Sequence, residues 1–346
     1  MILHPFQAEA LECLRRPSIH LALTAPTGSG KGVILEVLAQ DPRERVLVLT
    51  PLIALARQQR LRFLAQGVPT GRVRILSPES ALLQERAIRE WRPTVIAVDE
   101  AHCLPEWGGR FRPAYGKILR FIRESGCPRT VWMSATFPRP LLEELHRELP
   151  GPWTTLGKFR LPPNLRAQFV RLSAAERIER VRKDIVAREG PGLLFTGTRK
   201  EVGRYLGILS GTRAALPYHA GLADEERRLV EAALNRESAE EKNARTSVVA
   251  TNAFGMGMDF PQFRWTVLSH APFSLLGLMQ AFGRVARGER PGEAVLYWAE
   301  EDFRFAGLLL GESEGADQSH RALALFREYL EGDADQRARI ETETFL

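Results

Sequence analysis

Cysteine is scarce in this chain of 346 residues, which has three copies, at Cys13, Cys103 and Cys127. None of them forms a Cys-x-x-Cys pair, the spacing on which cysteine-based zinc centres and redox motifs are built. Three isolated thiols also exclude the disulfide frameworks that stabilise small secreted domains. The sequence therefore predicts no zinc and a fold that depends on its apolar core.

Long apolar runs are also lacking. The longest stretch without a charge runs from Trp265 to Gly283. It contains five residues unsuited to a bilayer interior: Ser269, His270, Pro272, Ser274 and Gln280. The stretch is too polar to span a membrane, and the first residues do not resemble a secretory leader. We expect no membrane association and a cytoplasmic location.

Lysine is rare among the basic residues, with 6 lysines and 42 arginines making up the 48. Two explanations stay open: a GC-rich genome, or a use for guanidinium groups, which bind phosphate well. Residues 1–157 carry 21 basic and 15 acidic side chains, residues 158–300 carry 22 and 16, and residues 301–346 carry 5 and 11. This distribution permits a polyanionic partner but does not require one.

Short apolar runs alternate with helical stretches along the chain, which is typical of parallel α/β sheets. The runs are 21–24, 46–49, 95–98, 131–133, 192–195, 215–218, 247–250, 265–268 and 294–298. The segment 150–163 is rich in proline and glycine and predicts an interdomain linker. We therefore predict an α/β domain over residues 1–157, a second over residues 158–300, and an acidic helical tail over residues 301–346.

The strongest local signal is the segment Ala-Pro-Thr-Gly-Ser-Gly-Lys-Gly at residues 25–32, between a predicted strand and a predicted helix. Small residues let backbone N–H groups converge on phosphate oxygens, and Lys31 reaches the β- and γ-phosphates. The predicted phosphate-binding residues are Thr27, Gly28, Ser29, Gly30, Lys31 and Gly32. Gly32 stands where a serine or threonine usually supplies a hydroxyl to Mg²⁺. Either a water completes the metal shell, or ATP is hydrolysed poorly.

Two adjacent carboxylates, Asp99 and Glu100, follow the apolar run 95–98. A parallel strand that ends there brings Asp99 near Lys31, where it can hold Mg²⁺, while Glu100 can polarise the attacking water as a general base. Two acids at a strand end are otherwise an ordinary solvated turn. The phosphate-binding segment favours the catalytic interpretation.

Together these segments resemble superfamily 2 helicases, and most closely the RecQ family, over nearly all of residues 1–300. The first-domain segments that carry the resemblance are Pro5-Phe-Gln, Thr50-Pro-Leu-Ile, Leu76-Ser-Pro-Glu, Asp99-Glu-Ala-His and Ser134-Ala-Thr. The resemblance implies that Gln7 reads adenine. It also implies roles in nucleic-acid contact or in coupling hydrolysis to motion for Pro51, Ser77, His102, Ser134 and Thr136.

An aromatic segment follows, Trp-Gly-Gly-Arg-Phe-Arg-Pro-Ala-Tyr at residues 107–115. It is similar to the RecQ loop that senses single-stranded DNA and signals the ATP site. Trp107 and Phe111 offer faces for base stacking, and Arg112 offers a phosphate or stacking contact. Without the neighbouring carboxylates, packing in a core would be the preferred interpretation of these aromatic residues.

The second domain resembles the remaining helicase motifs in the segments 163–165, 195–199, 218–222, 250–259 and 280–287. The resemblance implies backbone-contacting residues of the nucleic-acid path, Thr196, Arg199, His219 and Thr251. It implies nucleotide-site roles for Gly257 and Asp259, an arginine finger at Arg287 and a supporting contact at Arg284. Two arginines three residues apart are otherwise a common solvated helix face.

The resemblance implies two tandem RecA-like parallel-sheet domains with ATP and Mg²⁺ in a cleft between them. The implied function is an ATP-dependent helicase that moves 3′ to 5′ on single-stranded DNA or a tailed duplex. Two alternatives stay open: a non-catalytic nucleic-acid-binding accessory subunit, and an RNA-directed motor. Residues 301–346 do not match the family's zinc, winged-helix and terminal helical modules. We therefore expect weak unwinding unless a protein partner separates the strands or docks on the acidic tail.

Overall fold

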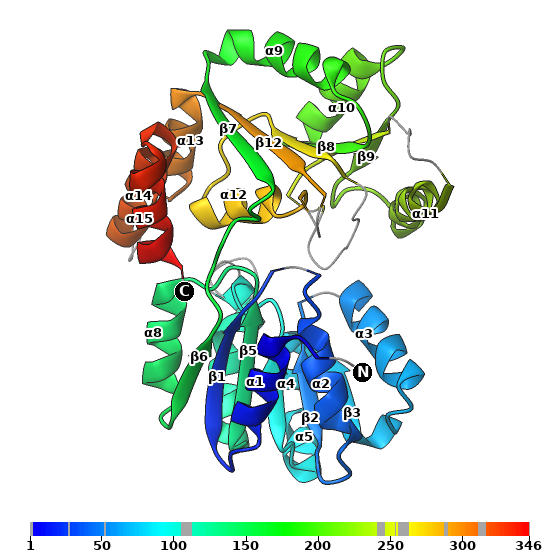
Figure 1. Cartoon of the computed structure of the whole chain (residues 1–346), viewed down its shortest axis with the longest axis vertical. Helices are drawn as coiled ribbons and strands as arrows, with labels where there is room; N and C mark the ends of the chain where they lie inside the picture. Colours follow the sequence, from blue (N-terminus) through cyan, green and yellow to red (C-terminus); the bar gives the residue numbers. More distant parts are fainter. Residues whose placement is uncertain are drawn as a thin grey trace. The chain divides into compact units, whose positions relative to one another are not determined.

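The computed structural model describes residues 3–26, 28–51, 53–104, 113–240, 246–252, 254, 263–286, 290–310 and 316–345. The chain forms two compact units. Met1–Phe159 together with Glu341–Leu346 make the first, and Arg160–Ile340 make the second. Each unit contains a six-stranded parallel sheet with flanking helices (Figure 1). The predicted fold class of two tandem parallel-sheet domains is confirmed.

The first unit contains, in chain order, α1 (Pro5–Leu14), β1 (Ile19–Thr24), α2 (Lys31–Gln40), β2 (Val46–Leu49), α3 (Ile53–Ala65), η1 (Thr70–Arg72), β3 (Val73–Leu76), α4 (Pro78–Leu83), α5 (Glu85–Trp91), β4 (Val95–Val98), α7 (Pro113–Ser125), β5 (Arg129–Ser134), α8 (Arg139–Glu148) and β6 (Trp153–Leu156). Its strand order is β3-β2-β4-β5-β1-β6.

The register of the first sheet brings several strand ends to one edge. Thr24 at the end of β1 lies beside Ser134 at the end of β5. Leu49 at the end of β2 lies beside Val98 at the end of β4. Because the strands are parallel, the residues that follow them gather at this carboxyl edge.

Apolar side chains explain why these strands sit inside the unit. All the residues of β1, β2 and β4 are buried, as expected for parallel strands covered on both faces. One core cluster joins Leu14 of α1 and Ile34 of α2 to Leu21 and Val48 of the sheet. This packing holds α2, and the loop before it, against the carboxyl edge.

The second unit contains β7 (Leu165–Arg171), α9 (Ala174–Ala187), β8 (Gly192–Phe195), α10 (Arg199–Leu209), β9 (Ala215–Tyr218), α11 (Asp224–Glu240), β10 (Ser247–Ala250), β11 (Trp265–Leu268), α12 (Leu275–Phe282), β12 (Gly292–Trp298), α13 (Glu300–Leu310), α14 (Ala316–Glu331) and most of α15 (Ala334–Thr344). Its strand order is β7-β12-β11-β8-β10-β9. Trp265 packs so tightly on β8 that a Cβ at Gly192 would lie 2.0 Å from its ring. Glycine is therefore required there.

One segment differs from the sequence-based expectation. The predicted linker 150–163 contains β6, which pairs with β1 at the edge of the first sheet. The expectation of a linker over the whole of 150–163 was wrong at residues 153–156, because two β-branched threonines between the turns at Gly151 and Gly157 form this short strand. The two units divide between Phe159 and Arg160, inside the same segment. In the predicted tail, the residues up to Ile340 pack with the second unit, while Phe345 is buried against Phe159 in the first.

Within the described ranges, no helix is both long enough and apolar enough to cross a membrane.

Candidate active site

At the carboxyl edge, the described residues of the loop before α2 have the conformation of an anion site. Gly28 and Gly30 have positive φ angles of 79° and 84°. Gly30 is the N-cap of α2 and offers no capping side chain, so the helix N-terminus is open to an anionic ligand. The positive φ of Gly30 favours glycine at this position, and a Cβ there would also lie 2.8 Å from Gln7 Nε2.

Lys31 folds back over this loop. Its Nζ donates to the carbonyl oxygens of Ala25 at 2.8 Å and Pro26 at 3.1 Å. These bonds hold a positive charge above the N-terminus of α2. When a nucleotide binds, the ammonium group can exchange these two carbonyl partners for the phosphate oxygens.

Four hydroxyls at this edge are buried and have no hydrogen-bond partner among the residues that the structure describes: Thr24, Ser29, Thr50 and Thr136. Buried polar atoms in native proteins nearly always have a partner, and exceptions call for an explanation such as a ligand or water. Because all four lie at the edge that also carries Lys31, they indicate a polar ligand. A nucleotide phosphate fits this set of groups.

Gln7, the predicted adenine contact, is buried in α1. Its Nε2 donates to the carbonyl oxygen of Gly30 at 2.9 Å. Its Oε1 accepts a hydrogen bond from the backbone N–H of His4 at 2.8 Å. The side chain therefore ties α1 to the phosphate-binding loop, and adenine recognition by Gln7 stays a prediction.

Asp99 leaves β4 directly into this site. Its Oδ2 accepts a 2.6 Å hydrogen bond from Gln59 Nε2, and its Oδ1 accepts one from the backbone N–H of Glu100 at 3.0 Å. Burial, together with the negative charge of Glu100, raises the pKa of Asp99 to about 6, although Lys31 opposes the rise. A cation bound here would offset that cost. Sequence reasoning did not identify Gln59, because nothing in its local pattern marks it.

Glu100 connects the site to the segment after β5. Its backbone is left-handed, with φ of 51°, an uncommon conformation for a residue with a Cβ. Its Oε2 lies 3.4 Å from His102 Nδ1, which lies 2.8 Å from Ser134 Oγ. The Ser134 hydroxyl donates to the carbonyl oxygen of Thr136 at 2.5 Å, so its oxygen is left to accept from His102. The chain of contacts runs from Glu100 through His102 and Ser134 to Thr136.

The residues present fit a Mg²⁺ ion of the kind that is held mainly by substrate. Among the described residues, no three His, Cys, Asp or Glu side chains gather closely enough to make a metal cage. Mg²⁺ commonly binds through one or two carboxylates together with substrate phosphates and water. Asp99, buried beside the phosphate-binding loop, is the carboxylate that suits this role.

Gly32 leaves room for the missing hydroxyl. A Cβ built there meets only Glu36 Oε1, at 3.9 Å, which is an ordinary contact. The Glu36 side chain is itself 6% exposed. We expect Gly32→Ser to lower the Mg²⁺ concentration for half-maximal ATPase activity by about tenfold, the range typical of an added metal-site partner.

The control for this variant is Gly203→Ser, at a helical glycine of α10 with open space around it. Magnesium titrations of both variants and the wild type make the comparison. An unchanged titration for Gly32→Ser would show that another group already occupies that ligand position. Glu36→Gln would then be the next variant to titrate.

Two other predicted residues of the first unit, Ser77 and Pro51, also lie at the carboxyl edge. Ser77 caps α4, with its Oγ accepting from the backbone N–H of Ser80 at 3.2 Å. Pro51 is buried directly after Thr50. Both lie just after strand ends at the carboxyl edge, where a ligand that spans the edge would pass.

In the second unit, the predicted residues also follow strand ends. Thr196, His219 and Thr251 come directly after β8, β9 and β10. His219 Nδ1 is buried without a hydrogen-bond partner in the described parts of the chain. Arg199 packs so closely on Gly221 that a Cβ there would lie 2.6 Å from its Nη1. Arg284 follows α12, two residues after its last residue.

Seven predicted site residues lie outside the described residues: Thr27, Trp107, Phe111, Arg112, Gly257, Asp259 and Arg287. Their roles stay predictions.

Comparison with known proteins gives two domain matches. Residues 4–96 match the model of the DEAD/DEAH box helicase domain, and residues 176–289 match the helicase conserved C-terminal domain. The chain is 28% identical over 309 residues to the probable ATP-dependent DNA helicase RecS of Bacillus subtilis, covering 80% of this chain and 60% of that protein. It is 28% identical over 329 residues to the ATP-dependent DNA helicase RecQ of Pasteurella multocida, covering 86% and 51%.

Solved structures share the fold. The helicase MrfA bound to DNA matches with a TM-score of 0.64 at 23% identity, over 86% of this chain and 48% of that one. Mss116p bound to single-stranded RNA and AMP-PNP matches with a TM-score of 0.68 at 18% identity, over 90% and 72%. The chain thus spans between about half and three fifths of the length of the two curated relatives named above.

Proposed function

Because this chain is a RecQ-like superfamily 2 protein, with DEAD/DEAH box and helicase C-terminal domains, we propose that it is an ATP-dependent DNA helicase or translocase. The observation that supports this most is the chain of contacts from Glu100 through His102 to Ser134, beside Lys31 and Asp99. It connects a candidate catalytic carboxylate with a second strand end. A simple nucleotide-binding scaffold has no need of that connection.

In the proposed reaction, Lys31 and the N–H groups of α2 bind the ATP phosphates, and Asp99 holds the metal ion. When bound there, Mg²⁺ would supply a positive charge that offsets the charge of the phosphates. Glu100 orients the attacking water and accepts its proton. We assign Arg284 and Arg287 to the charge that develops on the γ-phosphate, because a guanidinium group there can raise the hydrolysis rate greatly.

We assign the DNA path to the residues that follow the strands in both units, and we propose movement 3′ to 5′ because the sequence motifs resemble those of the RecQ family. The experiment that tests the function measures ATP turnover with no nucleic acid, with single-stranded DNA, with duplex DNA and with RNA. Stimulation by single-stranded DNA is the expected result. Stimulation by RNA alone would support an RNA-directed motor, and no turnover at all would support a non-catalytic subunit.

The coupling role of His102 has its own test. We expect His102→Ala to keep basal ATPase activity within about threefold of the wild type. We expect stimulation by single-stranded DNA to fall at least about fivefold, because the variant removes one or two hydrogen bonds worth about 1 kcal/mol each. Ser134→Ala interrupts the same chain and should behave alike. His146→Ala, at an exposed histidine of α8, is the matched control. Equal losses of basal and stimulated activity would assign His102 to the hydrolysis step instead.

A further inference from the structure

The active site does not use the opposite edge of the first sheet. Two depressions with volumes of about 1010 and 990 Å³ adjoin there, and Arg45, Arg89 and Arg92 line both. Their linings include residues just before β1, β2, β4 and β5, namely Pro17, Arg45, Thr94 and Pro128. Because the strands are parallel, this is the amino edge. The six residues of β1 separate it from the carboxyl edge by about 20 Å.

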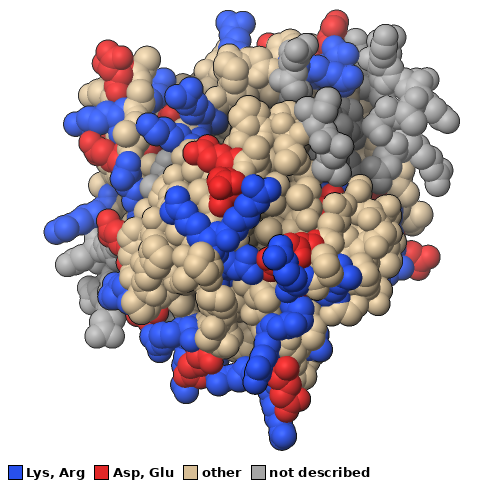
Figure 2. All heavy atoms as spheres, turned by 60° about the horizontal axis from the view of Figure 1, so that its bottom comes forward, with Lys and Arg blue, Asp and Glu red and all other residues tan. Residues whose placement is uncertain are grey.

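We call the lining of these two depressions the arginine face. It contains eight arginines and four carboxylates: Arg15, Arg16, Arg43, Arg45, Arg86, Arg89, Arg92 and Arg129, with Asp41, Glu44, Glu85 and Glu90. Figure 2 brings this end of the first unit forward and shows basic side chains gathered over it with fewer acidic ones. The face has an excess of four positive charges.

Each carboxylate on the face already has an arginine partner. The pairs are Asp41–Arg43, Glu44–Arg129, Glu85–Arg89 and Glu90–Arg86. A fifth arginine, Arg15, pairs with Glu12. Within the described part of the chain, no carboxylate lies within ion-pair distance of the other three, Arg16, Arg45 and Arg92.

The floor of the face is an ion pair that is largely buried and hydrogen-bonded within the protein. Arg129 and Glu44 form a two-bond pair of 3.0 and 2.6 Å, with the two side chains 13% and 12% exposed. Arg129 Nη1 also donates to the carbonyl oxygen of Leu14 at 2.8 Å. This pair is satisfied within the protein, so the charge available to a partner lies on the exposed arginines around it.

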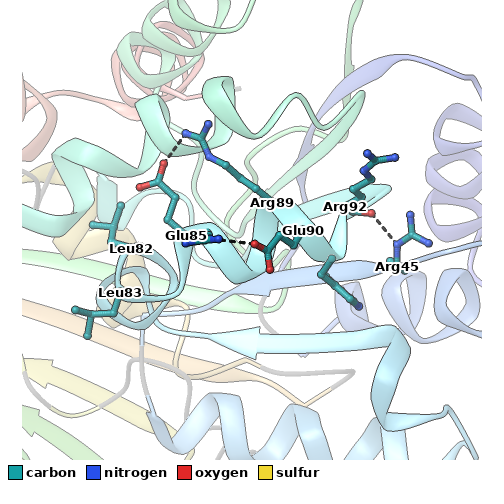
Figure 3. A pocket seen from close by; sticks show the side chains of 9 residues that line it. Arg45, Leu82, Leu83, Glu85, Arg89, Glu90 and Arg92 are labelled. Atoms are coloured by element: carbon teal, nitrogen blue, oxygen red, sulfur yellow. Dashed lines mark hydrogen bonds and ion pairs between the residues drawn. The ribbon is translucent and has the colours of Figure 1, made fainter.

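Arg45 and Arg92 come together at the junction of the two depressions. Arg45 Nε donates to the carbonyl oxygen of Arg92 at 2.7 Å (Figure 3). Arg92 follows α5 in the left-handed region, with φ of 53°, where glycine or asparagine is more usual. The need to end helix α5 does not by itself explain an arginine at this left-handed position. The bond holds Arg45 against the backbone of Arg92, so that two arginines lie side by side at this junction.

The lining favours a duplex over a single strand or an acidic peptide. Single-strand sites use aromatic faces for base stacking, and the one aromatic residue of the face, Trp91, is covered by Arg74 at 4.8 Å and donates to the carbonyl oxygen of Gly71. A docked peptide needs a pocket for an apolar anchor. Leu83, at the end of the face in Figure 3, is 88% exposed and forms no such pocket.

We propose that the arginine face binds the phosphate backbone of duplex DNA, as a contact separate from the ATP-dependent path. A duplex keeps its bases stacked and presents only phosphates, which guanidinium groups bind without reading sequence. Three unpaired arginines on separate segments suit such a repeated charge. The choice of DNA rests on the proposed function, whereas the binding surface itself does not depend on ATP hydrolysis.

The test measures binding of a blunt duplex of about 20 base pairs by fluorescence anisotropy without ATP, at several salt concentrations. We expect Arg45→Ala with Arg92→Ala to weaken binding at least about tenfold and to reduce the salt slope by about two. Because that variant also removes the contact between Arg45 and Arg92, the exposed Arg16→Glu serves as a second variant. Arg147→Ala with Arg204→Ala, at exposed arginines outside the face, is the control.

ATPase stimulation by poly(dT) is measured in parallel and should stay within about twofold of the wild type in every variant, since the carboxyl edge lies about 20 Å away. If poly(dT) does not stimulate the ATPase of the wild type, the proposed function is contradicted, whereas the duplex-binding measurement still tests the arginine face. Duplex binding that matches the control in both variants would overturn the duplex site. If the variants lose binding of an oligoglutamate peptide but keep binding of the duplex, the duplex site would also be overturned, in favour of an acidic protein partner.

Discussion

Replacing Glu100 by glutamine should leave ATP binding close to that of the wild type and slow hydrolysis by at least about 10²-fold, the usual contribution of a general base. Glutamine has nearly the same shape, so the left-handed turn at φ of 51° and the contact with His102 can persist. What disappears is the ability to take a proton from the attacking water. A 10²-fold loss corresponds to about 2.7 kcal/mol of transition-state stabilisation.

The measurement is single-turnover hydrolysis together with nucleotide affinity, both with and without single-stranded DNA. Glu90→Gln, at an exposed glutamate of α5, controls for the loss of one negative charge. Near-normal hydrolysis by Glu100→Gln would assign proton transfer to another group. A matching loss of nucleotide affinity would instead show that the Glu100 carboxylate acts in nucleotide or metal binding, since the backbone N–H of Glu100 that bonds Asp99 Oδ1 is unchanged in the variant.

The sequence predicts the central strands well and the edge strands poorly. The bounds of β2, β4, β8, β10 and β11 coincide with the apolar runs read from the sequence, because each of these strands is buried along its whole length. The strands that the sequence did not predict, β3, β6 and β7, all lie at sheet edges.

Edge strands have a weaker apolar signal for a physical reason. They pair on one side only and cover less of the core, so polar residues such as Thr154 or Arg166 are tolerated in them. The other edge strand, β9, was predicted because its four residues, Ala-Leu-Pro-Tyr, are all apolar or compatible with an edge. An apolar run of residues is therefore what the sequence pattern reports: it coincides with full burial in the central strands, and in β9 it occurs although only Tyr218 is buried.

The candidate site shows a similar division. Lys31, Asp99 and Glu100 could be predicted because each belongs to a local pattern next to an apolar strand. The contact between His102 and Ser134 joins residues 32 positions apart, and that between Gln59 and Asp99 joins residues 40 apart. Such contacts depend on which strands are neighbours and in which register, and local spacing does not contain that information.

Replacing Lys31 by alanine should reduce ATP turnover by at least about 10³-fold, at the upper end of what one transition-state donor contributes. Two effects act in the same direction. The variant removes the ammonium group that would leave Ala25 and Pro26 to bind the phosphates. It also removes the charge that opposes the rise of the Asp99 pKa, so Asp99 would hold its proton to a higher pH and bind a cation less well.

Lys31→Arg separates these two effects, because it keeps a positive charge near Asp99 while changing the geometry toward the phosphates. Lys117→Ala, at an exposed lysine of α7, is the control for general loss of charge. Turnover and Mg²⁺-dependent nucleotide affinity are measured for all three. If Lys31→Arg keeps the Mg²⁺ dependence but loses turnover, the phosphate contact dominates, whereas turnover above about a tenth of wild type in Lys31→Ala would remove Lys31 from the catalytic site, since such a loss is worth only about 1.4 kcal/mol.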